Sequence, residues 1–240
     1  MMLVSICLMV LLQQTASTGD VSYFSLMTHD RSVQMDITNK HNQLRRLTQP
    51  SASNMLKLTW NDQVAQNAEK WAKKCTMSHS PPHERQIRFA DCGENLFMSS
   101  NPRNWSYAIQ SLYNEVTDFR YGSGDTRPNV KTGHYTQLVW ATSHQLGCAL
   151  AHCPNKRLKF YYVCQYCPAG NNIKTRNTPY KKGKPCADCP GHCDNGLCTN
   201  PCMYQDRFSN CQQLTQNYKC GSRFMEDNCP ATCKCLTEIK

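Results

Sequence analysis

The number and placement of the cysteines constrain this chain more than any other feature. It has 17 Cys in 240 residues, and ten of them lie between Cys186 and Cys235. Such a density is typical of a disulfide scaffold formed in an oxidising secretory pathway. Zinc-binding cysteines are the alternative, but C-x-x-C spacing occurs only at Cys164–Cys167 and Cys186–Cys189, which leaves most of the cysteines unexplained. Disulfides are therefore favoured.

The N-terminus predicts export. Residues 3–12 form an apolar run that is too short to span a bilayer, and small residues that suit a signal peptidase follow it. No Lys or Arg precedes the run. We expect residues 1–19 to be a secretory signal peptide. Its removal takes away Cys7 and leaves an even number of cysteines, all of which can pair. The sequence thus predicts a secreted, extracellular protein.

The charge is uneven along the chain. Residues 20–185 carry 22 Lys and Arg against 11 Asp and Glu, whereas residues 186–240 carry 5 against 6. A basic surface outside the cell favours an anionic glycan or lipid as partner and argues against nucleic acid. An evenly solvated surface is the alternative.

Two regions of different composition follow the N-terminus. Up to residue 167 the cysteines are sparse and aromatic residues are frequent, whereas the Cys-rich tail has no apolar run that could form a core. So short a segment needs disulfides to offset its ordering entropy. The polar, basic stretch 171–184 between the two regions is interpreted as a linker. It either contacts anionic lipid or glycan, or is a solvated, flexible spacer.

Hydrophobic periodicity gives a coarse secondary structure for the first region. Apolar residues at helical spacing predict helices over residues 36–47, 63–75 and 107–119. Apolar or alternating runs predict strands over residues 136–140, 148–152 and 159–166. Helices followed by antiparallel strands indicate an α+β sandwich.

Four short motifs resemble those of a known superfamily. The blocks GHYTQLVW (133–140) and YVCQYCPAGN (162–171) are similar to the two signature blocks of the CAP superfamily, and HNQLR (41–45) and CGENL (92–96) to its shorter blocks. With ten cysteines in the tail as well, everything after the signal peptide resembles a vertebrate cysteine-rich secretory protein (CRISP) of the mammalian male reproductive tract type.

The resemblance implies a fold and a domain order. It implies a CAP-type α-β-α sandwich in residues 20–170, a linker and two-disulfide hinge in 171–201, and a small helical toxin-like (ShK-like) Cys-rich domain in 202–240. Spacing alone leaves the disulfide pairing open. The pairs that the resemblance implies are Cys75–Cys153, Cys92–Cys167, Cys148–Cys164, Cys186–Cys193, Cys189–Cys198, Cys202–Cys235, Cys211–Cys229 and Cys220–Cys233.

The resemblance also places His79, Glu94, Glu115 and His134 in an open cleft. Two imidazoles are suitable Zn²⁺ ligands, and two carboxylates can orient the rings. Helical periodicity puts Glu115 at the rim of the core. We expect weak, pH-dependent Zn²⁺ binding at His79 and His134, with no cofactor required, because only a neutral imidazole can bind metal. A hydrogen-bonded polar cluster that joins sheet and helices is the alternative.

Catalysis at this cleft is the minority interpretation. Ser78 and Ser80 flank His79, so a metal-assisted hydrolase is conceivable. The sequence has no nucleophile elbow and no H-E-x-x-H motif. We therefore expect a protein that is not an enzyme.

Two further positions are candidates for binding and modification. Arg223 and Phe224 are the nearest match to the Lys–aromatic pair of sea-anemone channel toxins, but Glu226 and Asp227 follow at once. This argues against plugging of a cation pore and leaves contact with the channel's outer rim; ordinary exposed and packing residues are the alternative. The sequon Asn104-Trp105-Ser106 makes Asn104 a glycosylation candidate.

The resemblance therefore implies a secreted protein that acts by binding. Its expected partners are a cell-surface protein or ion channel, and the sperm or egg membrane, in the male reproductive tract. A venom-type channel modulator is one alternative, and the metal-assisted hydrolase is the other.

Overall fold

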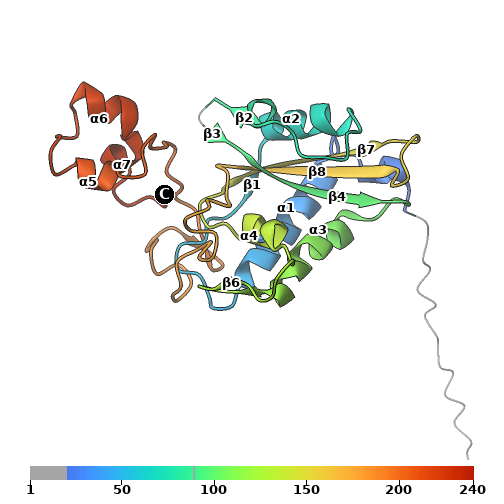
Figure 1. Ribbon diagram of the computed structural model, residues 1–240, viewed down its shortest axis with the longest axis horizontal. Coiled ribbons are helices and arrows are strands. Elements are labelled where there is room, and N and C mark those ends of the chain that lie inside the picture. The colour runs from blue at the N-terminus through green and yellow to red at the C-terminus, as the bar shows by residue number, and fades with distance from the viewer. Residues whose placement is uncertain (1–20, 89) are drawn as a thin grey trace, which may run out of the picture.

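The computed structural model describes residues 21–88 and 90–240. The predicted signal peptide, with Cys7, lies outside these residues. A three-layer sandwich forms the larger part of the molecule, and the Cys-rich tail lies beyond one end of it (Figure 1). Within the two described ranges, no helix is both long enough and apolar enough to cross a membrane.

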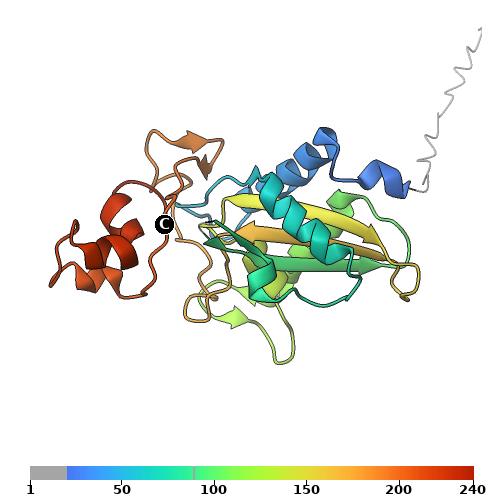
Figure 2. The same ribbon diagram turned by 90° about the horizontal axis from the view of Figure 1, so that it is seen from above.

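A four-stranded sheet is the middle layer, in the order β1-β7-β8-β4. Strands β4 (Gly93–Ser99), β7 (Gln145–His152) and β8 (Phe160–Cys167) are antiparallel, and β1 (Thr59–Trp60) pairs in parallel with β7. Helix α2 (Asp62–Ala72) covers one face, while α1 (Arg31–Arg46), α3 (Trp105–Tyr113) and α4 (Gly133–Leu138) cover the other (Figures 1 and 2). The expected α+β sandwich, with helices on both faces of the sheet, is confirmed.

Hydrophobic burial on both faces explains the order of the layers. All eight residues of β8 are buried, as expected for a central strand with helices above and below it. Gly147 in β7 allows α2 to approach closely, because a Cβ at this position would lie 2.1 Å from the backbone nitrogen of Ala65. Short polar side chains cap the helices: Asp30 caps α1, Asn61 caps α2 and Asn104 caps α3.

The smaller elements are short. They are η1 (Tyr23–Leu26), η2 (Pro82–Glu84), β2 (Gln86–Ile87), β3 (Ala90–Asp91), η3 (Asn114–Asp118), β5 (Phe119–Arg120), β6 (Gly124–Asp125), β9 (Cys193–Asp194), β10 (Leu197–Cys198), α5 (Cys211–Leu214), α6 (Arg223–Asn228) and α7 (Pro230–Lys234).

Two secondary-structure predictions need correction. The strand predicted over residues 136–140 is wrong, because this stretch belongs to helix α4 and the turn after it. The run is buried almost throughout, and a short buried run carries no alternation that could separate strand from helix. The helix predicted over 107–119 ends at Tyr113 and continues as the tighter η3.

The stretch 171–184 is not a flexible spacer. Its backbone binds the sandwich through hydrogen bonds from Ser53 N to Lys181 O (2.8 Å) and from Ala141 N to Pro179 O (2.9 Å). Tyr180 is buried and its ring packs on that of Tyr121. These hydrogen bonds satisfy backbone N–H and C=O groups that would bind water in a flexible spacer. The stretch, called the strap below, therefore lies fixed along the sandwich.

Sixteen cysteines form eight disulfides in the structure, in the pairs that the resemblance implies. Three lie in the sandwich, two in the hinge and three in the tail. The hinge is held to the sandwich by hydrogen bonds from Cys198 N to Met55 O (2.7 Å) and from Lys57 N to Cys198 O (2.8 Å). Leu197, in the same hinge strand, is fully buried in the sandwich core.

Candidate functional site

Glu94 on β4 anchors the first half of the predicted cleft. Its side chain is buried and accepts hydrogen bonds from His79 Nδ1 (2.9 Å), from both the backbone N (2.9 Å) and Oγ (2.8 Å) of Ser80, and from Gln165 Nε2 (3.0 Å). Burial raises the pKa of the Glu94 carboxyl, but the hydrogen bonds outweigh burial and the pKa is lowered overall. Glu94 is thus a carboxylate that holds the exposed His79 ring.

Glu115 performs the same task for His134 in the second half. Its carboxylate accepts hydrogen bonds from the backbone N of His134 (2.9 Å) and of Tyr135 (3.0 Å), at the start of α4. His134 Nδ1 lies 2.6 Å from the other carboxylate oxygen. The predicted position of Glu115 at the rim of the core agrees with its half-buried side chain.

Both histidines are therefore held in the same way. A carboxylate that binds Nδ1–H leaves the lone pair on Nε2, which is the arrangement that metal-binding histidines use in proteins. The side chain of His79 is 57% exposed and that of His134 is 38% exposed. The pair offers two imidazole nitrogens to a ligand from solvent.

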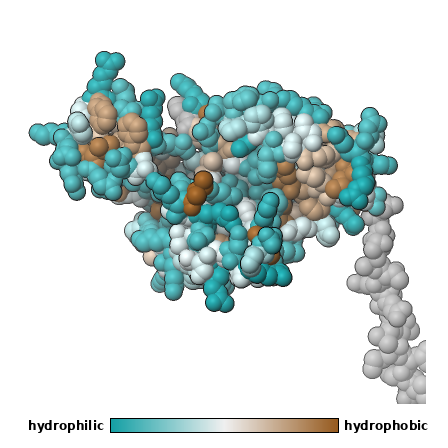
Figure 3. Space-filling model, viewed as in Figure 1, coloured by the Kyte–Doolittle hydropathy of each residue, from teal (hydrophilic) through white to brown (hydrophobic). Residues whose placement is uncertain are grey.

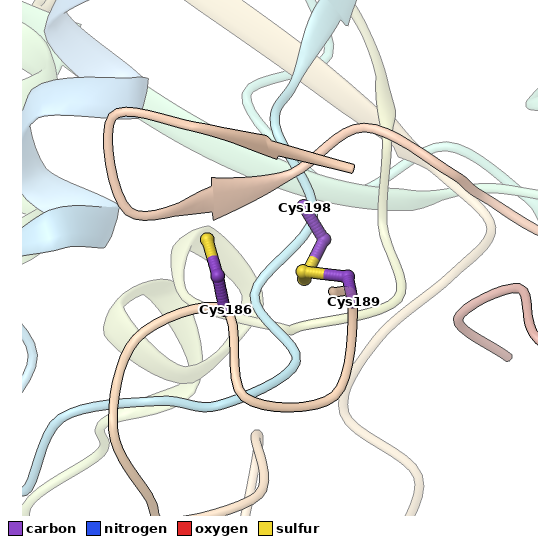
Figure 4. A group of neighbouring side chains, drawn as sticks. All are labelled: Cys186, Cys189 and Cys198. Atoms are coloured by element: carbon purple, nitrogen blue, oxygen red, sulfur yellow. A yellow bond between two sulfur atoms is a disulfide. The ribbon is translucent and has the colours of Figure 1, made fainter. Parts of the chain in front are cut away.

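The four residues do not form a compact metal cage. Among the described residues, the one group of three potential metal ligands within 4.8 Å of one another is Cys186, Cys189 and Cys198. These cysteines lie together in the hinge (Figure 4), where all three are in disulfides. Neither place gives a metal three free protein ligands, so an ion held by His79 and His134 would keep open coordination positions.

A buried polar chain supports the His134 half from below. His41 in α1 is fully buried. Its Nδ1 lies 2.8 Å from Ile37 O, and its Nε2 lies 2.9 Å from the hydroxyl of Tyr166. Asn95 Nδ2 donates to that hydroxyl (3.4 Å) and to the backbone oxygen of His134 (3.0 Å). From the sequence, His41 was singled out only as part of the motif HNQLR (41–45). Its place on the apolar face of a helix was the signal for a buried histidine.

The two serines beside His79 have structural roles. The backbone oxygen of Ser78 accepts hydrogen bonds from Trp71 Nε1 (2.8 Å) and the Tyr161 hydroxyl (2.7 Å). The hydroxyl of Ser80 donates to the Glu94 carboxylate and is buried, so it is not open to a substrate from solvent. This geometry does not present Ser80 as a nucleophile.

Arg223 and Phe224 lie at the start of α6, whose N-cap is Ser222. The ring of Phe224 lies 4.9 Å from that of Tyr218 and 6.2 Å from that of Phe208. These three side chains, called the aromatic face below, are each between 40% and 46% exposed. The Arg223 side chain is 96% exposed beside them, 3.7 Å from Asp227. Figure 3 shows hydrophobic surface on the tail.

A groove between the tail and the sandwich was not predicted from the sequence. It has a volume of about 890 Å³, and Tyr121, Trp140, Tyr204 and Phe208 are among the residues that line it. Its two walls come from segments far apart in the sequence, so periodicity gave no signal for it.

Asn104 is exposed and caps α3 through its Oδ1, which accepts a hydrogen bond from Tyr107 N (2.8 Å). The next residue of the sequon, Trp105, is buried. A glycan would attach to Nδ2, which leaves the capping oxygen in place.

The comparisons with known proteins agree with this architecture. The sequence matches the Cysteine-rich secretory protein family over residues 38–166 and the Crisp family over residues 186–240. It is 52% identical to cysteine-rich secretory protein 2 of Homo sapiens, with 96% of this chain and 95% of that protein covered. It is 51% identical to the cysteine-rich venom protein helothermine of Heloderma horridum horridum, with 98% and 97% covered.

A solved structure shares the sandwich. The crystal structure of NaASP2 with Zn²⁺ has a TM-score of 0.56 and 31% identity, and the match covers 71% of this chain and 96% of that one. With a CAP domain, a Crisp domain and close relatives over nearly its whole length, this chain belongs to the cysteine-rich secretory protein (CRISP) family of the CAP superfamily and is a secreted protein.

Proposed function

We propose that this protein binds an ion channel at a cell surface through the aromatic face of its tail. The observation that supports the proposal is the set of three exposed aromatic rings, which pack on one another beside the exposed Arg223. Aromatic and Arg side chains carry much of the binding energy in protein interfaces. A small domain held by three disulfides also presents them at little entropic cost.

The charge around this face favours the channel's rim over its pore. Asp227 lies beside Arg223, and Glu226 is on the same helix. A plug in a cation pathway needs a clear positive charge, which Asp227 reduces here. The aromatic face suits a protein surface outside the pore, so we expect partial modulation of the current rather than full block.

We further propose that the partners are those of the male reproductive tract, with the sperm or egg membrane as the site of action. The relatives leave a venom-type use as the second candidate, because the human protein and the venom protein are equally similar to this chain. The tissue in which the chain is expressed separates the two.

The test of channel binding is current recording with the whole mature protein and single variants. We expect Phe224→Ala and Arg223→Glu each to weaken modulation about tenfold or more, as for central interface residues. Lys174→Glu, the same charge change on the exposed strap, is the control and should leave modulation unchanged. Equal loss in Arg223→Glu and Lys174→Glu, with Phe224→Ala unchanged, would mean that net charge, and not the aromatic face, carries the effect.

We propose that the His79/His134 cleft binds Zn²⁺ weakly and does not catalyse a reaction. The orientation of both rings by carboxylates supports the binding, and the burial of Ser80 argues against a nucleophile. Zn²⁺ should raise the melting temperature of the wild type. An equal rise in the His79→Ala, His134→Ala double variant would place the metal elsewhere. Turnover of a substrate that a chelator abolishes would instead favour the hydrolase.

A further inference from the structure

A second group of aromatic residues, partly exposed, lies at the opposite end of the sandwich from the tail. His152 and Phe160 close the β7–β8 hairpin and their rings stack, with centroids 5.0 Å apart. The ring of Tyr23 in η1 lies 6.0 Å from His152 and 6.1 Å from Phe160. Phe24 packs edge-on against Tyr23, and 82% of it is exposed to solvent. An aromatic side chain that packs against another ring on one side and is exposed to solvent on the other is suited to contact with a membrane or another molecule.

Three cations lie in the hairpin loop next to this aromatic group. The hairpin loop between His152 and Phe160 carries Lys156, Arg157 and Lys159, all of them exposed. Within the part of the chain that the structure describes, none of the three forms an ion pair with Asp or Glu. The loop and the aromatic residues of η1 together are called the cationic tip.

The segments that form the cationic tip carry no acidic residue. The sequence has no Asp or Glu from Thr126 to Ala187, nor in residues 21–29. Nearby carboxylates belong to α1 and α2. Asp30 caps α1, the exposed Asp36 lines a hollow with Ser25 and Leu26 of η1, and the Glu69 carboxylate lies 2.7 Å from Lys73 Nζ and 3.3 Å from His29 Nε2. Among the described residues, none of these carboxylates forms an ion pair with Lys156, Arg157 or Lys159.

The tip and the tail face away from each other. In Figures 1 and 2 the β7–β8 hairpin and η1 lie at one end of the sandwich, and the tail lies beyond the other. Figure 3 shows hydrophobic surface at the hairpin end, edged by hydrophilic surface. A contact made by the tip leaves the aromatic face of the tail free.

We propose that the cationic tip binds the surface of an anionic lipid membrane. Lys156, Arg157 and Lys159 would attract the lipid headgroups, at about fivefold in affinity for each cation near such a surface. Phe24 would enter the interface between headgroups and acyl chains, as aromatic side chains do in membrane-surface contacts. A sulfated glycan could use the three cations but would gain nothing from the exposed Phe24, which is why a lipid surface is favoured.

The test is co-sedimentation of the whole mature protein with vesicles of phosphatidylcholine, alone or mixed with phosphatidylserine. We expect binding to the mixed vesicles only. The triple variant Lys156→Gln, Arg157→Gln, Lys159→Gln should bind about a hundredfold more weakly, and Phe24→Ala about tenfold more weakly. In the variant Phe24→Trp, quenching by lipids brominated on their acyl chains should report entry of the side chain into the interface.

The strap provides a matched control. Lys174, Lys182 and Lys184 are exposed, and their replacement by Gln removes the same charge from another place. This control should keep nearly full binding. Equal loss of binding in the two triple variants would overturn the tip as the contact. Vesicle binding that is unchanged in Phe24→Ala would also overturn it. So would Phe24→Trp fluorescence that the brominated lipids do not quench. Retention on heparin beads without vesicle binding would assign the cations to a glycan. Because vesicles contain no channel, these results do not depend on the proposed action of the tail.

Discussion

His41 should make the protein sensitive to mild acid. Burial lowers the pKa of this imidazole from its ordinary value of 6.5 to about 4, against the hydrogen bond to Ile37 O, and Arg45 nearby adds to the decrease. In the unfolded chain the same imidazole takes up a proton near its ordinary pKa. The folded state thus loses stability as the pH falls below about 6.5, until the folded form also protonates near pH 4.

The size of the loss follows from the two pKa values. A difference of about 2.5 units at 1.36 kcal/mol per unit gives about 3 kcal/mol, a large part of the stability of an ordinary domain. The assay is denaturant unfolding at a series of pH values, with all disulfides intact. In His41→Gln the side chain cannot titrate, so the slope of stability against pH should flatten between about 4 and 6.5.

A control and a direct measurement make this result decisive. His192 is exposed in the hinge, and His192→Gln should keep the slope of the wild type. If His41→Gln fails to fold, an NMR titration of the wild-type imidazole gives the pKa directly. Identical slopes in wild type and His41→Gln, or a His41 resonance that titrates near 6.5, would refute the reasoning.

Four more variants, one of them a control, test the packing and the cleft. Arg45→Met should cost more than about 3 kcal/mol in urea unfolding, because the buried guanidinium donates to five backbone carbonyls that would lose their partner. Gly147→Ala should cost about 2 kcal/mol in the same assay through the clash with α2, whereas Gly133→Ala, whose Cβ would have no neighbour closer than 3.8 Å, should be nearly neutral. Glu94→Gln should destabilise by about 2 kcal/mol at neutral pH. That difference should shrink as the pH falls below the lowered pKa of the wild-type carboxyl, since protonation then removes the same acceptor.

The elements that were predicted well from the sequence are those whose buried residues recur at a regular spacing. Helices α1 and α2 and strands β7 and β8 each follow a clear apolar pattern, and the structure places them within a few residues of the predicted ranges. Strand β4 was missed because Glu94 and Asn95 are polar and nevertheless buried. Their burial depends on partners from distant segments, Ser80 and His134, which no local pattern contains.

The candidate site was accessible from the sequence only in part. Motif resemblance brought together the residue types of the cleft, and the structure pairs His79 with Glu94 and His134 with Glu115. The resemblance could not give the distance between the two His–Glu pairs, which depends on the packing of α4 against β4. The cationic tip was also hidden, since its aromatic residues lie at the N-terminus and its cations more than a hundred residues later. Only the folding of η1 against the hairpin makes one surface of them.

The docked hinge changes how the two proposed contacts can work together. A freely hinged tail could turn toward the same membrane that the tip binds. Here Ile239, near the end of the chain, packs with Cys189 and Cys198 of the hinge against Leu56 of the sandwich. Its backbone bonds to Asn200 and Cys202 hold it there. The tail's last residues are thus part of the contact that fixes the hinge, and moving the tail would expose this apolar cluster to water at a cost in free energy. The aromatic face is consequently held away from a membrane bound at the tip, which suits a channel on an opposing surface better than one beside the tip.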